Sequence, residues 1–171
     1  RIDGLDNIEI PEAITITPSV EEHYEDQAYK EKIANLLAGF GYNEIMTNSI
    51  TNAAYFSEEE QQSMVKMLNS LSAELNIMRP SMLETGLEAI AYNLNRKNND
   101  LKFFDFGKTY STSGSGKYHE TEHLCLYITG NKHQDGWRAK TGRSDFYFLK
   151  GVVIALLRLL GIKPDGVETF T

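Results

Sequence analysis

Two spacings of apolar residues run through this chain, one typical of helices and one typical of strands. Between residues 19 and 40, apolar side chains recur at three- and four-residue intervals, which predicts a helix with one apolar face. A capping-box sequence at residues 19–22 favours its start, and two glycines at positions 39 and 41 favour its end. The apolar face consists of Tyr29, Ile33, Leu36, Leu37 and Phe40. From this pattern alone, we expect the helix to pack on the sheet of its own domain, with a subunit interface as the alternative.

The middle of the chain predicts short strands that alternate with capped helices. Residues 42–50 and 65–68 are expected to be strands. Capping boxes at residues 57–60 and 81–84 predict a short helix and a longer helix that ends near residue 97. The longer helix is expected to turn five apolar residues inward: Leu83, Leu87, Ile90, Ala91 and Leu94.

The second half of the chain predicts a hairpin of two strands and a final helix. Residues 101–110 carry aromatic side chains on both faces, as a central strand does. A loop rich in glycine and serine at residues 111–117 leads to an alternating strand at residues 124–129. Ser144 or Asp145 is expected to cap the helix that follows. The predicted fold class is therefore α+β, an antiparallel β-sheet flanked by helices.

Both ends of the chain resemble cuts in a longer polypeptide. Residues 1–18 are interpreted as a linker from an upstream module. The last five residues alternate like a strand that stops without a partner. We therefore expect one core domain at residues 19–171, truncated at its C-terminal end, and a chain of 171 residues suits a single domain.

The net charge of −7 is spread unevenly along the chain. Residues 1–31 carry nine acidic and two basic side chains, whereas residues 79–163 carry thirteen basic and eight acidic ones. The bulk charge argues against general affinity for nucleic acid, but the basic second half leaves room for a locally positive face. The simpler interpretation of these charges is a solvated surface.

Three features of the sequence indicate the cellular compartment: the single Cys125, the length of the longest apolar run, and the N-terminal segment. A single cysteine forms no intramolecular disulfide, and among alternating apolar residues it is typical of a small core residue in a reducing cytosol. The longest apolar run, residues 152–160, contains Arg158 and is too short to span a bilayer. With no signal peptide in view, we expect a cytoplasmic protein without a membrane partner.

One motif suggests a metal site. Residues 119–123 read HETEH and match the zinc-protease pattern H-E-x-x-H. That chemistry requires both imidazoles on one face of a helix. Here the segment leads directly into an alternating strand, so we predict a polar strand edge and no metal ligand.

Other patterns of catalysis are missing from the sequence. Neither the phosphate-binding loop G-x-x-x-x-G-K-[ST] nor the fingerprint G-x-G-x-x-G occurs. No G-x-S-x-G motif supports a serine nucleophile, and no pattern supplies a base for Cys125. We therefore predict no catalytic residue from the motifs.

The order of several segments resembles a known family. Residues 36–50, LLAGFGYNEIMTNSI, look like the first signature of class II aminoacyl-tRNA synthetases. Residues 69–95 and 101–110 are similar to the core of the beta subunit of bacterial phenylalanyl-tRNA synthetase, and residues 1–11 resemble the junction leading into it. Residues 146–152, FYFLKGV, match a helix start that follows the second signature in both subunits of that enzyme. The resemblance covers nearly the whole chain and implies a class II catalytic-core-like fold.

Two departures from the family pattern concern the mechanism. The first signature normally ends in a proline, where Asn48 stands here. The second signature normally carries an arginine that holds the ATP α-phosphate, and Ser111 occupies that position. A serine hydroxyl cannot replace a planar, permanently charged, bidentate guanidinium. Ser111 therefore marks a degenerate ATP-site position, and this fragment alone is expected to be inactive.

The resemblance implies a scaffold role within a larger ligase. The whole enzyme joins phenylalanine to tRNA(Phe) with ATP and magnesium, as an assembly of two alpha and two beta chains in which the alpha subunit carries catalysis. This fragment itself is expected to hold no cofactor. The five apolar residues of the first helix become candidates for the alpha-subunit interface. Candidates for an RNA-facing surface are Arg96, Lys97, Lys117, Arg138, Lys140 and Arg143.

Two alternatives from other classes stay open. The chain could be a stand-alone, ATP-dependent ligase that adenylates a carboxylate, and Ser111 argues against this. It could also be a regulatory class II paralogue that binds an amino acid without chemistry.

Overall fold

The computed structural model describes residues 13, 16–17, 24–70, 72–133, 136–137 and 140–163. Its helices are α1 (Tyr24–Gly39), α2 (Leu83–Leu94) and α3 (Phe146–Leu159), with short 3₁₀ turns η2 (Ala53–Tyr55) and η3 (Glu60–Ser63). Its strands are β1 (Asn43–Glu44), β2 (Ile50–Thr51), β3 (Ile77–Met78), β4 (Lys102–Gly114) and β5 (Lys117–Ile128). The expected capping box at residues 19–22, the strand at residues 167–171 and most of the linker at residues 1–18 lie outside the described residues.

A long hairpin forms the centre of the fold. β4 and β5 pair antiparallel from Lys102↔Ile128 to Gly114↔Lys117, and β1 joins β4 in parallel at Phe103 and Phe104. β2 and β3 form a separate antiparallel pair. The predicted α+β class is confirmed, and the parallel β1–β4 pairing adds one feature that the sequence analysis did not predict.

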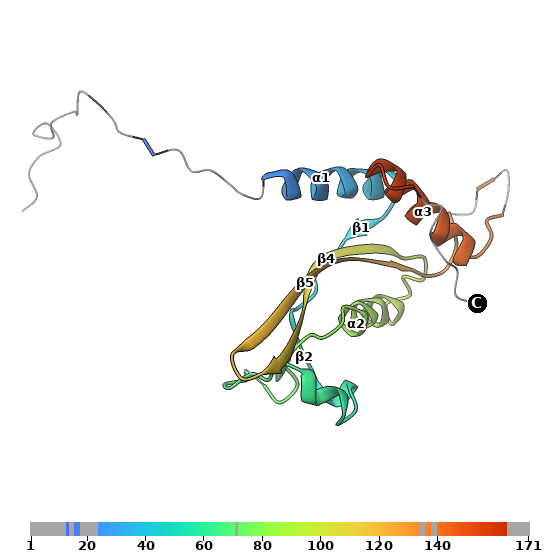
Figure 1. Cartoon of the computed structure of the whole chain (residues 1–171). Coiled ribbons are helices and arrows are strands. Elements are labelled where there is room, and N and C mark those ends of the chain that lie inside the picture. Colours follow the sequence, from blue (N-terminus) through green and yellow to red (C-terminus); the bar gives the residue numbers. More distant parts are fainter. Residues whose placement is uncertain are drawn as a thin grey trace, which may run out of the picture.

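Helices cover the inner end of the hairpin on both faces (Figure 1). Successive strand residues point to opposite faces. Phe104 packs with α1 and α3 in a cluster that includes Leu37 and Leu156, whereas Phe103 packs on the other face with Ile90 of α2. β4 is therefore buried on both faces at this end, as its aromatic pattern predicted.

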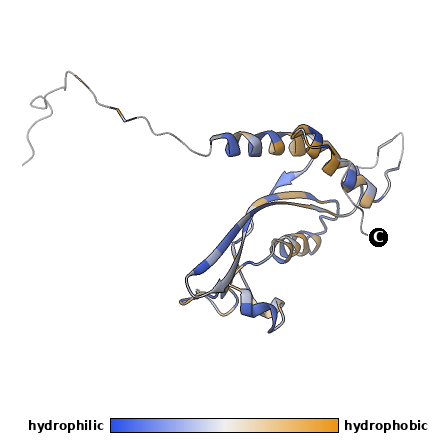
Figure 2. Cartoon of the chain, in the orientation of Figure 1, coloured by the Kyte–Doolittle hydropathy of each residue, from blue (hydrophilic) through white to orange (hydrophobic). Residues whose placement is uncertain are grey.

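The outer half of the hairpin is a two-stranded ribbon in which β5 is exposed to water, whereas β4 is partly covered. Every residue from Lys117 to His123 on β5 is exposed. Figure 2 shows the change from hydrophobic positions near the helices to hydrophilic positions toward the turn. The change explains why the apolar alternation in the sequence begins only at Leu124, although the strand itself begins at Lys117.

The predicted inward face of α2 is wrong. Leu83, Leu87 and Leu94 are 52%, 50% and 41% exposed, and Ala91 is exposed too. Of the five predicted residues, Ile90 alone is buried. The other buried residues of α2 are Thr85 and Gly86, which were not predicted. Gly86 faces the sheet and approaches it closely: a Cβ at this position would lie 2.0 Å from the Tyr127 ring. This close approach, and the hydrogen bond from the Tyr127 hydroxyl to the Met82 carbonyl (2.6 Å), set the rotation of the helix.

Several predicted boundaries are correct and others shift. The Ser57–Glu60 capping box is confirmed, since the Ser57 N–H and hydroxyl both donate to Glu60 Oε2 at 2.8 and 2.7 Å. Asp145 is the cap of α3 and accepts a 2.8 Å bond from the Phe148 N–H. The strand expected at residues 42–50 divides into β1 and the start of β2. Residues 65–67 pair only locally with residues 76–78.

Candidate functional site

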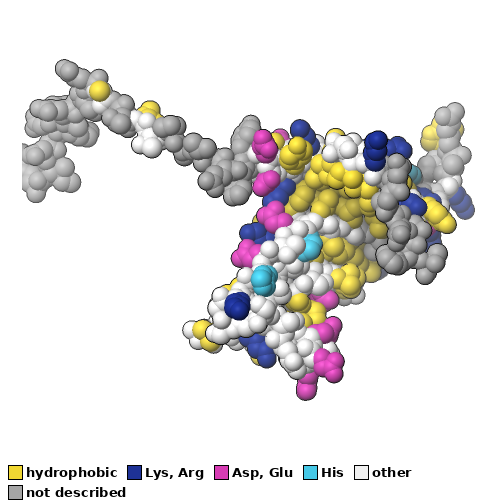
Figure 3. Space-filling model, viewed as in Figure 1, with side chains coloured by type: hydrophobic (Ala, Val, Ile, Leu, Met, Phe, Trp, Pro, Cys, Tyr) yellow, Lys and Arg dark blue, Asp and Glu magenta, His cyan; other side chains and the backbone are white. Residues whose placement is uncertain are grey.

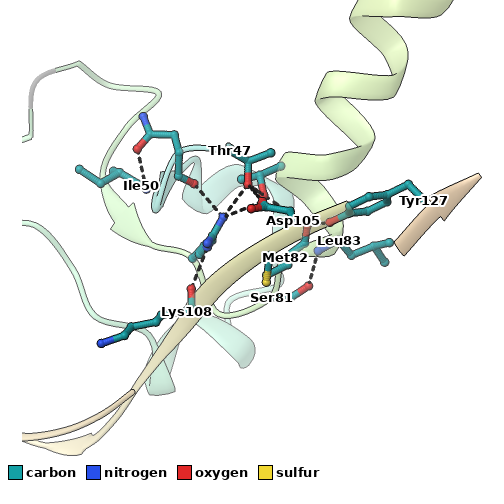
Figure 4. A network of polar contacts seen from close by, with 11 residues as sticks. Thr47, Ile50, Ser81, Met82, Leu83, Asp105, Lys108 and Tyr127 are labelled. Carbon is teal, nitrogen blue, oxygen red and sulfur yellow. Dashed lines mark hydrogen bonds and ion pairs between the residues drawn. The ribbon is translucent and has the colours of Figure 1, made fainter. Parts of the chain in front are cut away.

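The most connected polar group of the described chain is Arg79, just after β3. Its side chain is 3% exposed, and so is that of Asp105 on β4. Arg79 Nη1 donates to Thr47 Oγ1 at 2.6 Å, and the Thr47 hydroxyl donates to Asp105 Oδ2 at 2.5 Å. Arg79 Nη1 lies 3.8 Å from the same carboxylate oxygen. Figure 4 shows Thr47, Asp105 and Lys108 converging on this group.

Two main-chain carbonyls also lie beside the Arg79 guanidinium. Its Nε donates to the Lys108 carbonyl at 2.8 Å, and Nη1 is 3.4 Å from the Asn48 carbonyl. Gly107 makes room for the guanidinium, because a Cβ at this position would lie 2.0 Å from Nη2. A guanidinium held in this way forms hydrogen bonds with the protein's own backbone and an ion pair with its own carboxylate.

A polar hollow of about 340 Å³ adjoins the Arg79 group. Its cations are paired: Lys30 Nζ lies 2.8 Å from Glu122, and Lys108 Nζ lies 2.9 Å from Glu120. The hydrogen bond to Glu120 raises the pKa of Lys108 above its ordinary value. The hollow therefore holds balanced ion pairs that link α1, β4 and β5.

Ser111 lies on β4 opposite His119 of β5, and both residues are exposed. A hydroxyl in water neither carries charge nor excludes solvent, and both properties matter for stabilising a transferring phosphate. Arg79 is the buried arginine nearest in the fold to this strand's edge, but its hydrogen bonds commit it to Asp105, Thr47 and Lys108.

The five predicted interface residues separate into two groups. Leu37 is 0% exposed and belongs to the core with Phe104, and Ile33 and Leu36 are half-buried against it. A residue without exposed surface cannot contact a partner, so Leu37 serves the domain's own core. Tyr29 and Phe40 are 49% and 42% exposed. These two retain free apolar surface.

The predicted RNA-facing residues are scattered over the fold. Arg96 stacks on Tyr92, with its guanidinium carbon 3.3 Å from the ring centroid, and Lys97 follows at the end of α2. Lys117 lies at the turn of the hairpin, and β4, which separates this turn from Lys102, is about 40 Å long. Lys140 and Arg143 precede α3, and Arg138 lies outside the described residues. The pair before α3 lies in the loop that also carries Lys132, whose N–H donates to the Gly142 carbonyl.

The HETEH segment lies entirely within β5, as the sequence predicted. At about 3.3 Å per residue, His119 and His123 are about 13 Å apart along the strand and cannot bind one ion. Each ring has a partner on β4, since His123 Nε2 is 2.9 Å from the Thr109 hydroxyl and His119 Nε2 is 3.4 Å from the Ser113 hydroxyl. Among the described residues, no three potential ligands are arranged to hold a metal ion.

A second, larger hollow was not predicted. It has a volume of about 870 Å³ and lies where α1 ends and α3 begins. Its walls include Phe40, Tyr147 and Phe148, with Lys102 and His133 at the rim. The sequence feature that could have indicated this hollow is residues 146–148, FYF. Three successive aromatic residues at the start of a helix cannot all face the core, so at least one is expected to be exposed.

Comparisons with known proteins agree on the family. The family model described as "Phenylalanyl tRNA synthetase beta chain CLM domain" matches residues 10–169. A phenylalanine–tRNA ligase beta subunit of Bacteroides thetaiotaomicron is 41% identical over 95% of this chain and 21% of its own length. One from Lactobacillus acidophilus is 28% identical over 98% of this chain and 21% of its own length. The chain thus spans about a fifth of the length of these relatives.

Solved structures share the fold at low identity. An ATP phosphoribosyltransferase regulatory subunit/histidyl-tRNA synthetase from Bacillus halodurans aligns with a TM-score of 0.62 and 17% identity, over 91% of this chain and 39% of that one. A pyrrolysyl-tRNA synthetase from Desulfitobacterium hafniense aligns with a TM-score of 0.57 and 18% identity, over 80% and 45%. Within the described residues, no helix has the length and apolar character needed to cross a membrane. By its sequence, this chain belongs to the phenylalanyl-tRNA synthetase beta chain CLM domain family.

Proposed function

We propose that this chain is the non-catalytic, catalytic-like core of a phenylalanine-tRNA ligase beta subunit. In this proposal the domain is a scaffold for the alpha subunit and helps to position tRNA(Phe). The whole cytoplasmic enzyme uses ATP and magnesium to join phenylalanine to the tRNA, and this fragment holds neither. The relatives' names support a ligase with an alpha subunit as partner.

The observation that carries the inactive role is the distribution of positive charge around β4. The position that needs a phosphate-binding arginine has the exposed, neutral Ser111. The buried Arg79 is committed to internal hydrogen bonds, and Lys30 and Lys108 are in ion pairs. Binding the α-phosphate of ATP would require breaking one of these pairs.

Exchange of pyrophosphate into ATP in the presence of phenylalanine tests the inactive role. The chain alone is expected to give no exchange above background, and the assembled enzyme is the positive control. Exchange by the chain alone would show that it is an independent adenylating ligase. Saturable binding of phenylalanine or histidine without exchange would instead favour the regulatory paralogue.

Light scattering of the chain mixed with the alpha subunit tests the scaffold role. A complex is expected, and Tyr29→Ala is expected to weaken it about tenfold, since truncating an exposed aromatic anchor costs about this much at many interfaces. Tyr92→Ala, at an exposed tyrosine on α2, is the control and should leave the complex unchanged. If both variants assemble as the original chain does, the α1 surface is not the contact.

A further inference from the structure

The hollow between α1 and α3 has walls of a distinctive chemistry. Phe40 and Tyr147, both substantially exposed at 42% and 79%, bring aromatic surface from two different helices. Phe148 adds a third ring, with His133 packed edge-on at 5.9 Å between ring centroids. Flat aromatic faces that are open to solvent can stack with planar groups.

Glycines leave the hollow open. Gly39 ends α1, Gly41 follows it, and Gly151 lies in α3. A Cβ added at any of the three would meet nothing within 4 Å. The volume of about 870 Å³ therefore admits a ring system between the two helices.

Two lysines lie beside the aromatic surface. Lys102 Nζ and Lys132 Nζ lie 5.0 and 6.0 Å from the centroid of the Phe148 ring. Lys140 and Arg143, in the loop before α3, are exposed. Asp145 is bonded to Lys132 and to the Phe148 N–H. Figure 3 shows Lys and Arg side chains near the α3 end of the molecule, beside its apolar surface.

We infer that this hollow binds an unpaired nucleobase of RNA, stacked on Tyr147 or Phe40, with a flanking phosphate near Lys102. Aromatic platforms combined with a positive rim are what single-stranded nucleic acid requires. Lys102 brings a cation to the hollow, and no carboxylate within the described part of the chain pairs with it, so charge complementarity favours a polyanion over an apolar protein side chain. This inference rests on the tRNA-positioning part of the proposed function and names the site that performs it.

Fluorescence anisotropy with a labelled, unstructured 12-nucleotide RNA tests the inference. A Cβ at Gly151 would meet nothing within 4 Å, and Gly151→Leu places its side chain at the wall of the hollow while removing a helical glycine, so the variant is expected to fold. It is expected to weaken RNA binding about tenfold, the effect of losing one stacked base. Ala91→Leu, at an exposed site on α2, adds the same side chain elsewhere and should change nothing.

Two further variants separate stacking from charge. Tyr147→Ala, at a side chain too exposed to matter for folding, is expected to weaken binding about as much as Gly151→Leu. Lys102→Met is expected to lower the slope of log K against log salt by about 0.7, the effect of one lost phosphate contact. Circular dichroism checks that each variant is folded.

The outcomes distinguish this inference from the proposed function. Weaker RNA binding by Gly151→Leu and Tyr147→Ala, with unchanged alpha-subunit binding in light scattering, supports the nucleobase site. No RNA binding by the original chain, or binding that neither variant alters, overturns it and leaves the scaffold role standing. Loss of alpha-subunit binding in Gly151→Leu without any RNA binding would show that the hollow receives a protein side chain.

Discussion

The Nε of Arg79 donates a 2.8 Å hydrogen bond to the main-chain carbonyl of Lys108, at the edge of β4. β1 pairs with β4 only at Phe103 and Phe104, and the Ile45 N–H adds one bond to the Phe104 carbonyl. Beyond that point the Arg79 side chain supplies a donor, and its own carbonyl accepts from the Tyr110 N–H at 3.0 Å. One residue thus satisfies a stretch of strand edge that would otherwise be open.

Removing the Arg79 side chain is expected to destabilise the domain strongly. Arg79→Met leaves the Asp105 carboxylate buried without its cation, which costs about 3–5 kcal/mol in free energy of unfolding. Urea unfolding followed by circular dichroism measures this change. Arg96→Met, at an exposed arginine, should stay within about 0.5 kcal/mol of the original chain. A loss below 1 kcal/mol for Arg79→Met would mean that water replaces the guanidinium without cost.

The two glycines inside helices should respond oppositely to alanine. Gly86→Ala drives a methyl group into the Tyr127 ring and is expected to cost about 1–3 kcal/mol. Gly151→Ala meets nothing within 4 Å and should stabilise the chain by about 0.5–1 kcal/mol. Thermal melts of the two variants measure the contrast directly. Equal effects would contradict the close approach of α2 to β5.

Substitutions on α2 distinguish the observed buried face from the one the sequence predicted. Ile90→Ala is expected to cost about 2–4 kcal/mol, because this side chain is 8% exposed in the cluster with Phe103. Leu87→Gln, on the outward face, should change the free energy of unfolding of this chain by no more than about 0.5 kcal/mol. Denaturant unfolding of both variants decides the matter. A larger loss at Leu87 would restore the predicted face.

The Asp145 carboxylate should make stability depend on pH in the acid range. Its hydrogen bond from Lys132, and then that from the Phe148 N–H, hold its pKa below the ordinary value of 3.8. A lowered folded-state pKa stabilises the fold above the unfolded value, and this stability is lost as pH falls through the folded value. Asp145→Asn keeps a good helix cap without the charge.

The original chain should therefore melt above Asp145→Asn at pH 7. The difference should shrink as the pH falls below 3.8, measured by thermal melts in buffers of equal ionic strength. Because the ion pair is exposed, added salt should reduce the difference at pH 7. A difference that persists unchanged at pH 2 would show that the aspartate acts only through its shape.

The elements with a local signal were predictable from sequence. The Ser57–Glu60 box and the Asp145 cap are side-chain to backbone bonds within three residues, so local sequence specifies them. Aromatic residues on both faces of β4 indicated a strand buried on two sides, and the clusters around Phe103 and Phe104 confirm it. The hydrophilic outer half of β5 had no such signal, because a strand exposed on both faces carries no apolar alternation.

The sequence by itself determined the family, the α+β class and the neutral residue at position 111, because each depends only on which residues occur and in what order along the chain. Only the tertiary structure decided which face of α2 is buried, where Arg79 acts and that Phe40 and Tyr147 share one hollow. α2 has apolar residues on more than one side, so periodicity does not specify which face of the helix is buried. The close approach of Gly86 to Tyr127 in the folded domain fixes that face. Contacts between residues many positions apart depend on how whole elements pack, and no local pattern encodes them.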